Sequence, residues 1–253
     1  MTVSTEFDRY PRTGRFLAGR LRSEMSEAEK TELEGLVVDT MTLRDGARAI
    51  ARGDACNWSA ILIDGFVLRT LENGGRRYAV SFHVPGDFVD LHCFALRRLD
   101  HNIDCVGRAT IGQVPHSAIT RVMAERPHLA RLFWFSTLLD AAMHREWIMK
   151  LEQLTAPKRI AHVFAEIWRR LDMVGLGYPD GFETPLRQTD IAEMCGATAI
   201  HTNRALADLR RNGLADFQRG QVRIADRRKL EAYADFDPAY LYSDGALALR
   251  KTG

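Results

Sequence analysis

Short apolar runs separated by turn-forming residues occupy the chain from about residue 35 to residue 116. Asp64-Gly65 and Asn73-Gly74-Gly75 each lie between two apolar-rich runs, and Pro85-Gly86-Asp87 follows. Glycine supplies the positive φ that tight hairpin turns need, so these positions predict turns between strands. Strands are expected to resume over residues 103–114. Strands at this close spacing predict an all-β barrel or sandwich, here a β-roll of the cupin-like or jelly-roll kind.

A long helix is predicted next, because Pro127 begins about 25 residues without Gly or Pro. One apolar row has the three-and-four spacing of a helix face: Leu132, Phe135, Leu139 and Ala142. Further apolar side chains fall on other faces: Leu138, Met143, Trp147 and Leu151. A helix that is apolar on more than one side must bury more than one side. We assign the first row to pairing with a second subunit, and the alternative is a helix buried within a single domain.

The stretch from Gln188 to Arg211 has the pattern of two helices joined by a sharp turn. The first helix is expected to bury Ala192, whose small side chain lets the two helices cross closely. Gly196 can adopt the left-handed conformation that the turn demands. The hydroxyl of Thr198 can cap the second helix. These features together predict a helix-turn-helix.

The second helix of such a motif enters the major groove of DNA with its N-terminal side chains against the base edges. The exposed early positions are Ala199, Ile200, Asn203 and Arg204. Arg204 can donate two parallel hydrogen bonds to guanine, whereas Ile200 can only contact a thymine methyl. A small hairpin, the wing, should follow with its turn at Arg219-Gly220, placing Arg219 and Arg223 to contact phosphates. A helical pair in a protein–protein module is the alternative.

The chain therefore divides into three units, and its fold class is α+β. Residues 1–116 hold N-terminal helices and the β-roll, and one of these helices should start from a capping box at Ser26. Residues 117–154 form the dimerisation helix. Residues 155–253 form the winged helix-turn-helix and a C-terminal tail, beginning with a helix over residues 155–172.

Charge supports this division only modestly, because the net charge of the whole chain is +2. Residues 155–230 hold 13 Lys and Arg against 9 Asp and Glu, so the positive excess lies where a polyanion-binding unit needs it.

Two sets of motifs resemble the Crp/Fnr family of bacterial regulators. The C-terminal set resembles the DNA-binding domain of that family: Gln188-Thr-Asp-Ile-Ala, Gly196-x-Thr198, Asn203-Arg204-x-Leu206-x-x-Leu209 and Gly213-Leu214. The N-terminal set is similar to the effector-binding β-roll: Gly65-Phe66-Val67, Gly75-Arg76-Arg77 and Phe82-x-x-Pro85-Gly86-Asp87-Phe88-Val89. The resemblance covers roughly residues 30–230 and implies a homodimer on a two-fold pseudo-palindromic operator.

The resemblance also implies roles for single residues. The base-reading positions of the family fall on Ala199, Ile200, Asn203 and Arg204, of which only Arg204 keeps the usual residue. The phosphate contacts of the family fall near Gln188, Thr198 and His201, and we add Thr189 to this DNA-binding set. Thr202 stands where a buried Val or Ile is usual.

The effector is not evident from the sequence. Family members that bind cyclic AMP hold its phosphate with an Arg-Ser pair and its ribose with a Glu, where this chain has Ile103-Asp104 and Leu91. Asp104 would repel a phosphodiester, so we predict that cyclic AMP does not bind. An iron–sulfur cluster is disfavoured as well, because residues 1–35 contain no cysteine. The effector-pocket candidates are Gly86, Asp87, Val89, Leu91, His92, Ile103 and Asp104.

The four cysteines are far apart in sequence and form no CxxC pair, so we expect reduced and mostly buried thiols rather than a zinc site or a disulfide framework. His92-Cys93 and Cys105 can be read as haem-binding or redox-sensitive groups, or as ordinary core. Cys195 can be a redox switch or an inert buried thiol. No histidine pairs with a carboxylate at metal-site spacing, so no metal site is expected.

Other classes of protein fit less well. An enzyme on a cupin-like domain needs His and Glu ligands grouped on its strands, which residues 55–115 lack, and hydrolase and nucleotide-binding loops are missing. We therefore do not expect an enzyme. A cyclic-nucleotide-binding-like adaptor without DNA function is the alternative. Neither an apolar run of membrane-spanning length nor a signal-peptide core is present, so a cytoplasmic protein is expected. The expected partners are double-stranded DNA, a second copy of the chain and RNA polymerase.

Overall fold

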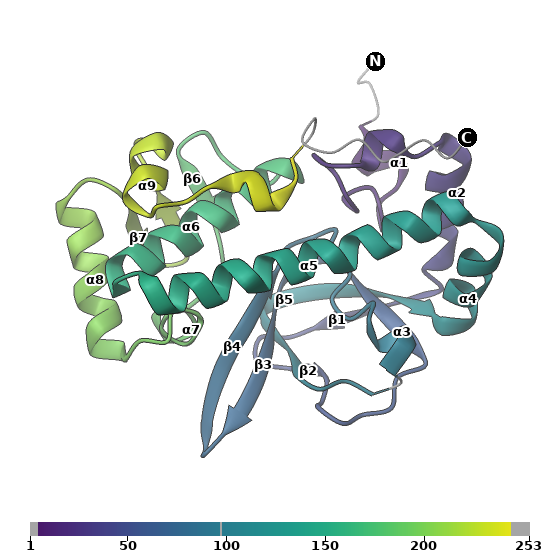
Figure 1. The fold of residues 1–253 in the computed structure, drawn as a ribbon, viewed down its shortest axis with the longest axis horizontal. Coiled ribbons are helices and arrows are strands. Elements are labelled where there is room, and N and C mark those ends of the chain that lie inside the picture. The colour runs from purple at the N-terminus through teal and green to yellow at the C-terminus, as the bar shows by residue number, and fades with distance from the viewer. Residues whose placement is uncertain (1–4, 97, 244–253) are drawn as a thin grey trace.

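The structure, a computed structural model, describes residues 5–96 and 98–243. Helix α5 (Pro127–Gln153) runs along most of the length of the molecule. The β-roll lies on one side of it, and helix α6 (Ala156–Met173) lies on the other side together with the C-terminal segment (Figure 1). In the described part of the chain, no helix is both long enough and apolar enough to cross a bilayer.

The N-terminal segment contains α1 (Glu6–Arg9), the 3-10 helix η1 (Arg22–Glu24) and α2 (Glu27–Leu36). The predicted capping box is confirmed. The Ser26 hydroxyl accepts a hydrogen bond from the backbone N–H of Glu29 at 3.3 Å, and the Glu29 carboxylate accepts one from the backbone N–H of Ser26 at 2.9 Å.

A five-stranded antiparallel sheet forms the β-roll. Strands β1, β5, β3 and β4 are neighbours in that order, and β2 pairs with β5. The inner faces of these strands enclose an apolar core of their own, which includes Leu62, Val67 and Ile111. The elements are β1 (Asp39–Leu43), β2 (Arg48–Ile50), β3 (Trp58–Asn73), β4 (Arg76–His83), the short helix α3 (Cys93–Leu96) and β5 (Asn102–Pro115).

The turn predicted at Asp64-Gly65 is not a hairpin. Strand β3 continues through it, and its register against β5 shifts on both sides of Asp64, which is the signature of a bulge. Gly65 is required there, because a Cβ on it would lie 2.1 Å from the carbonyl oxygen of Arg108. The turn predicted at Asn73-Gly74-Gly75 is confirmed, since it joins β3 to β4 with Asn73 opposite Arg76.

The region predicted as one dimerisation unit holds two helices. Helix α4 (His116–Glu125) ends at Arg126, and α5 starts at Pro127. Proline favours the first turn of a helix but keeps the residue before it out of the helical conformation, so the chain breaks at this point. The predicted boundaries at residues 116/117 and 154/155 lie at the start of α4 and between α5 and α6.

The C-terminal unit follows the expected order of elements. A three-stranded sheet pairs β8 with β6 and β7, and residues 244–253 of the expected tail lie outside the described residues. The elements after α6 are β6 (Gly181–Glu183), α7 (Gln188–Met194), α8 (Ala199–Arg211), β7 (Asp216–Gln218), β8 (Gln221–Arg223), α9 (Arg227–Tyr233) and the 3-10 helix η2 (Pro238–Leu241).

The segment around η2 folds back over the two long helices. The Tyr242 ring meets the ring of Phe135 on α5 at 5.9 Å between centroids, and the Tyr240 hydroxyl donates to Glu166 on α6 at 2.8 Å. Arg20 of the N-terminal segment donates to the Leu241 carbonyl at 2.8 Å. Both ends of the described chain therefore cover α5, which the sequence pattern did not reveal.

Candidate nucleic-acid interface

Helices α7 and α8 form the predicted helix-turn-helix. Gly196 adopts the expected left-handed conformation with φ of 58°. Thr198 is the N-cap of α8, and its hydroxyl accepts a hydrogen bond from the backbone N–H of His201 at 3.3 Å. The cap satisfies one of the amides that the first turn of a helix leaves free, so it fixes the direction in which α8 leaves the turn.

The inner faces of the two helices pack as expected. Ile191 and Leu209 are fully buried, and Ala192 is 7% exposed where α7 meets α8. Thr202 is also fully buried, and its hydroxyl has no hydrogen-bond partner in the described chain. The position that usually holds Val or Ile is therefore a core position here too, and a buried unpaired hydroxyl costs about 1–3 kcal/mol there.

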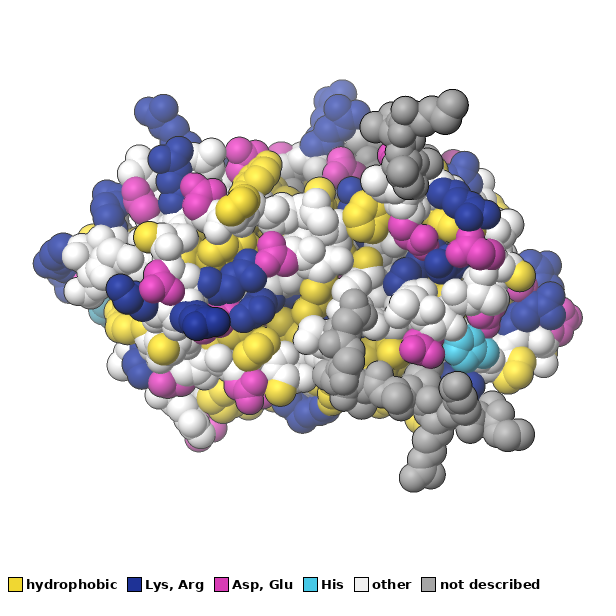
Figure 2. Space-filling model, turned by 90° about the horizontal axis from the view of Figure 1, so that it is seen from above, with side chains coloured by type: hydrophobic (Ala, Val, Ile, Leu, Met, Phe, Trp, Pro, Cys, Tyr) yellow, Lys and Arg dark blue, Asp and Glu magenta, His cyan; other side chains and the backbone are white. Residues whose placement is uncertain are grey.

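The outer face of α8 is open to solvent. Ile200 is 65% exposed, although it is a large apolar side chain. The other predicted base-reading residues Ala199, Asn203 and Arg204 are exposed, as are the predicted phosphate-contacting residues Gln188, Thr189, Thr198 and His201. Figure 1 shows α8 at the end of the molecule, away from the β-roll. In Figure 2, Lys and Arg side chains project from this end, interspersed with Asp and Glu.

Hydrogen bonding divides the arginines of α8 into two kinds. Arg210 donates to Asp216 at 2.6 Å, and Arg211 pairs with Asp208 one turn back. Within the described chain, no partner is present for the side chain of Arg204. The first half of α8 thus presents an uncompensated cation, and the second half does not.

The wing is confirmed as a hairpin of β7 and β8. Its turn holds Arg219 and Gly220, both with positive φ (49° and 82°). Arg219 and Arg223 are exposed, and the guanidinium of Arg223 donates only to the neighbouring Gln221, at 3.3 Å. Both cations lie on the surface beside the helix-turn-helix, where we expected them.

A salt-bridge cluster ties the helix-turn-helix to the β-roll. Arg77 of β4 donates to Asp190 at 2.7 Å and to Glu193 at 2.8 Å, and both acids lie on α7. Burial raises the pKa of Glu193, and Arg77 offsets part of this effect. This contact is not evident from sequence patterns, because 113 and 116 positions separate its partners.

Arg170 links α6 to the β-roll in a second place. Its guanidinium is 1% exposed and donates to the Phe82 carbonyl at 2.7 Å and to the Glu166 carboxylate at 3.2 Å. It also pairs with Asp87 in the turn after β4, and this charge lowers the pKa of Asp87 even though burial opposes the shift. The unit that carries the helix-turn-helix is therefore bonded to the β-roll through a buried cation.

The dimer face predicted on α5 is wrong. Its four side chains lie inside the chain itself: Leu132, Phe135, Leu139 and Ala142, at 0%, 7%, 4% and 3% exposure. They are covered because the N-terminal segment and η2 pack against α5 from outside the β-roll. Trp134, Leu138 and Ile148 form an apolar row on the surface of α5 and are 64%, 51% and 66% exposed. Leu151, near the end of the helix, is 39% exposed. A second subunit would have to use this row.

Most of the predicted effector-pocket residues do not line a pocket. Gly86 and Asp87 border a cavity of about 30 Å³ between the β-roll, α5 and the N-terminal segment. Val89 and Ile103 are fully buried core residues, and Leu91 is 7% exposed in the core. A cavity of this size holds about one water molecule. It is small because the side chains that line it, including Phe16, fill most of the space.

Asp104 is not the free anion that we expected. It is 3% exposed, and it accepts hydrogen bonds from Arg48 at 2.7 Å and from the Thr70 hydroxyl at 2.5 Å. Its charge is therefore already compensated within the chain. That cyclic AMP does not bind stays a prediction.

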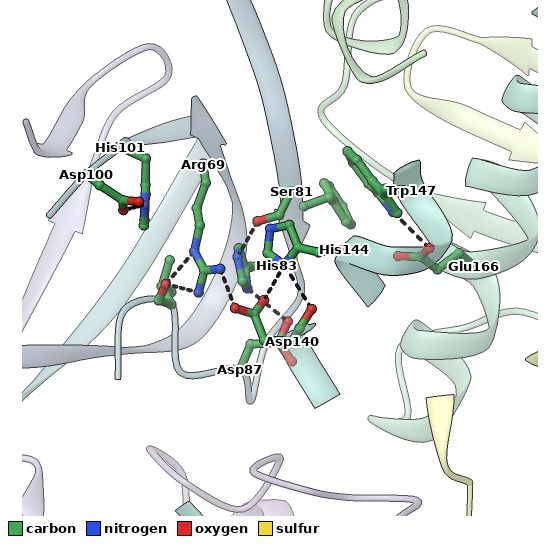
Figure 3. Close-up of polar contacts among 12 residues, drawn as sticks. Arg69, Ser81, His83, Asp87, Asp100, His101, Asp140, His144, Trp147 and Glu166 are labelled. Carbon is green, nitrogen blue, oxygen red and sulfur yellow. Dashed lines mark hydrogen bonds and ion pairs between the residues drawn. The ribbon is translucent and has the colours of Figure 1, made fainter. Parts of the chain in front are cut away.

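Figure 3 shows a polar network between the β-roll and α5. Arg69 of β3 donates to Asp140 of α5 at 2.5 Å and to the Val89 carbonyl at 2.7 Å. Burial alone would raise the pKa of Asp140, but the charge of Arg69 brings it down to about 2. His83 lies beside this pair and donates or accepts a hydrogen bond with Ser81 at 2.7 Å.

The cysteines are mostly buried, as predicted. Cys93, Cys105 and Cys195 are buried, and Cys56 is half-buried. Burial raises the pKa of Cys195 and of Cys105 to about 11, so both thiols are protonated near neutral pH. Cys56 and Cys93 are neighbours in space although 37 positions separate them in sequence, and a hydrogen bond joins their thiols.

Sequence spacing indicates no pair of histidine and carboxylate ligands, but the fold brings one such group together. His92, Asp100 and His101 bring their ligand atoms within 4.8 Å of one another. His92 precedes α3 and the other two residues precede β5, so residues 8 and 9 positions apart in sequence meet. His92 is the only one of the three that we had placed among the effector-pocket candidates.

Comparison with known proteins agrees with this architecture. The family model of the Crp-like helix-turn-helix domain matches residues 158–233. The nitrogen fixation regulation protein FixK of Bradyrhizobium diazoefficiens is 28% identical over 160 residues, which cover 63% of this chain and 66% of that protein. The transcriptional activator protein FnrL of Cereibacter sphaeroides is 28% identical over 210 residues, which cover 80% and 81%.

Among solved structures, FixK2 from Bradyrhizobium japonicum superposes with a TM-score of 0.70 at 21% identity. The match covers 77% of this chain and 96% of that one. The β-roll, the long helix and the winged helix-turn-helix thus follow one another here as in a known fold. Residues 158–233 match the Crp-like helix-turn-helix domain, and the chain is similar to the regulators FixK and FnrL.

Proposed function

We propose that this chain is a DNA-binding transcription regulator that acts as a homodimer on a two-fold pseudo-palindromic operator. The observation that carries the DNA-binding part is the open N-terminal half of α8. Its cation Arg204 is exposed and unpaired in the described chain, and the helix that carries it is capped by Thr198 at its N-terminus. A helix presented in this way fits the major groove.

The surface around α8 suits a phosphate backbone. A hollow of about 610 Å³ lies between the wing and the start of α7, and Arg187, Arg210 and Arg219 border it. Phosphate contacts position a protein on DNA without reading sequence, whereas contacts to base edges specify the site. We therefore assign positioning to Arg219, Arg223 and Gln188, and base recognition to Asn203 and Arg204.

The exposed row on α5 supports the dimer. Trp134, Leu138 and Ile148 are spaced so that they follow one side of the helix, and each is at least half exposed. An aromatic and two aliphatic side chains in one row are a suitable core for a two-fold interface. Two copies paired along α5 would present two α8 helices to successive half-sites.

The relatives support the regulatory role. FixK is named for regulation of nitrogen fixation and FnrL for transcriptional activation. We extend the regulation of transcription to this chain, with RNA polymerase as a further partner and the cytoplasm, where bacterial DNA lies, as its location.

Replacing Arg204 with Ala tests the proposal. Operator fragments are first selected from a random pool with the wild-type protein. Arg204→Ala should then bind the selected site roughly 30-fold to 3 × 10⁴-fold more weakly, which corresponds to roughly 2–6 kcal/mol for two bidentate base contacts, one in each half-site. It should also lose its preference at one base pair of each half-site.

Arg211→Ala is the matched control, because Arg211 is an exposed arginine on the same helix whose charge Asp208 already pairs. It should bind the selected fragments nearly as well as the wild type. If both variants bound with unchanged affinity and base preference, α8 would not be the reading helix.

A further inference from the structure

We propose that His92, Asp100 and His101 form a binding site for a divalent transition-metal ion on the β-roll. His92 directly precedes α3, whereas Asp100 and His101 lie just before β5. In Figure 3, Asp100 and His101 lie on the side of Arg69 that faces away from Asp140. The site lies outside the helix-turn-helix and outside the row on α5, so it is independent of the function proposed above.

An unpaired buried nitrogen points to a missing ligand. His101 is 6% exposed, and its Nε2 has no hydrogen-bond partner in the described chain. Leaving a buried polar atom unpaired costs about 1–3 kcal/mol, so proteins rarely retain one without a use. The other ring nitrogen, Nδ1, lies 2.7 Å from an oxygen of Asp100, a hydrogen bond that the carboxylate would exchange for the ion on binding it.

His92 supplies the second imidazole. The centroid of its ring lies 5.4 Å from that of His101, and the ligand atoms of His92, Asp100 and His101 are all within 4.8 Å of one another. Ligand atoms bound at about 2.0–2.2 Å to one tetrahedral ion lie about 3–3.5 Å apart. Side-chain rotations that move each ligand atom by about 1 Å would therefore bring all three atoms within bonding distance of one ion.

The protonation states favour a metal. Burial, reinforced by the charge of Arg69, lowers the pKa of His92 and of His101 to about 4, so both rings are neutral at pH 7. Neutral imidazole is the form that binds metals, and no proton has to be displaced from it at that pH. Arg69, whose charge acts on both rings, also forms an ion pair with Asp140.

The ligand set selects the class of ion. Two imidazoles and one carboxylate suit Zn²⁺, Fe²⁺, Co²⁺ or Ni²⁺ rather than Mg²⁺ or Ca²⁺, which prefer oxygen ligands. The Asp100 side chain is 79% exposed, so the ion can enter from solvent and keep water on its open positions. A site of this kind leaves coordination positions free for a small ligand.

Zinc titration of the chelator-treated full chain tests the proposal by calorimetry. The wild type should bind one Zn²⁺ per chain at this site. His101→Gln and His92→Gln should each fail to bind this ion or bind it with at least tenfold lower affinity. His128→Gln is the matched control, because the Nδ1 of His128 also lies 2.7 Å from a carboxylate, that of Glu29, without a second histidine. It should bind zinc like the wild type.

Circular dichroism and thermal melting establish which variants are folded. If the substitution at the buried His101 unfolds the protein, His92→Gln, at a half-buried position, provides the test instead. Cobalt substituted for zinc should give visible d–d absorption without an intense thiolate-to-metal band. Equal zinc binding by the wild type and a folded His92→Gln or His101→Gln variant would overturn the proposal. A strong thiolate band would overturn the ligand set, since no cysteine is part of it.

Discussion

Two adjacent leucines on α5 allow a sharp test of the dimer. Leu138 is 51% exposed in the row that we assign to the partner subunit, whereas Leu139 is 4% exposed and packs inside the chain. We predict that Leu138→Glu separates the subunits but leaves each of them folded. Leu139→Glu should instead unfold the protein, because it places a carboxylate in the core.

The size of the effect at Leu138 follows from its exposure. Burying a whole leucine side chain contributes about 1.5–3 kcal/mol, so the exposed half contributes about 1 kcal/mol, and the two copies in a two-fold dimer about 2 kcal/mol. Two carboxylates brought close to a two-fold axis add desolvation and repulsion of about 2 kcal/mol more. A total of about 4 kcal/mol raises the dimer dissociation constant about a thousandfold.

Sedimentation equilibrium over a range of protein concentrations measures that constant, and urea unfolding of the same samples measures the stability of the subunit. Leu139→Ala is the control for the buried position. It should lower the free energy of unfolding by about 2–5 kcal/mol through the cavity it leaves, with little effect on subunit association while the protein is folded.

The reasoning fails if folded Leu138→Glu associates as tightly as the wild type. The apolar row of Trp134, Leu138 and Ile148 would then not be the interface, and the two α8 helices would not be paired through α5.

Two further predictions concern buried ionisable groups. Lys150 is fully buried, and its Nζ lies 3.7 Å from the centroid of the Trp147 ring, with no hydrogen-bond acceptor among the described residues. Burial lowers its pKa, so Lys150→Met should raise the free energy of unfolding at pH 7 by about 1–3 kcal/mol, and a lower value in urea titration would contradict this. His162 is fully buried with both ring nitrogens unpaired, and burial lowers its pKa to about 4. The unfolded state therefore binds the proton more tightly, so stability that is complete above about pH 6.5 falls by about 3 kcal/mol on the way to pH 4, and His162→Phe should remove this part of the slope. Equal pH dependence of the two proteins in urea titrations would show that His162 is not buried in its neutral form.

The helix-turn-helix could be predicted almost residue by residue because its determinants are local. A glycine at the turn and a threonine at the cap act within a few positions of themselves, and Gly196 and Thr198 do what their types and spacing indicate. The hairpin at Asn73-Gly74-Gly75 succeeds for the same reason. Asp64-Gly65 fails because glycine serves a bulge as well as a turn, and only the continuous pairing of β3 with β5 decides between them.

The faces of α5 could not be assigned from periodicity. Apolar residues occur on several sides of this helix, and which side is free depends on segments more than a hundred positions away, such as the one around Tyr242. The His92, Asp100 and His101 cluster was missed because its members are not spaced as ligands on one helix or strand. The signal available in the sequence was that two histidines and an aspartate lie within ten positions of one another, before and after a short helix.

The buried guanidinium of Arg170 bears on whether the C-terminal unit is autonomous. An excised fragment starting at Thr155 would expose that cation and strip it of the Phe82 carbonyl and of Asp87, while the turn after β4 would lose the charge that neutralises Asp87. Neither piece would keep its native surface. Because Arg170 of α6 bonds to Asp87, a rearrangement of the Pro85-Gly86-Asp87 turn would displace α6 as well. Since α6 packs against α8, the β-roll could change the orientation of α8 on a DNA duplex without a hinge residue.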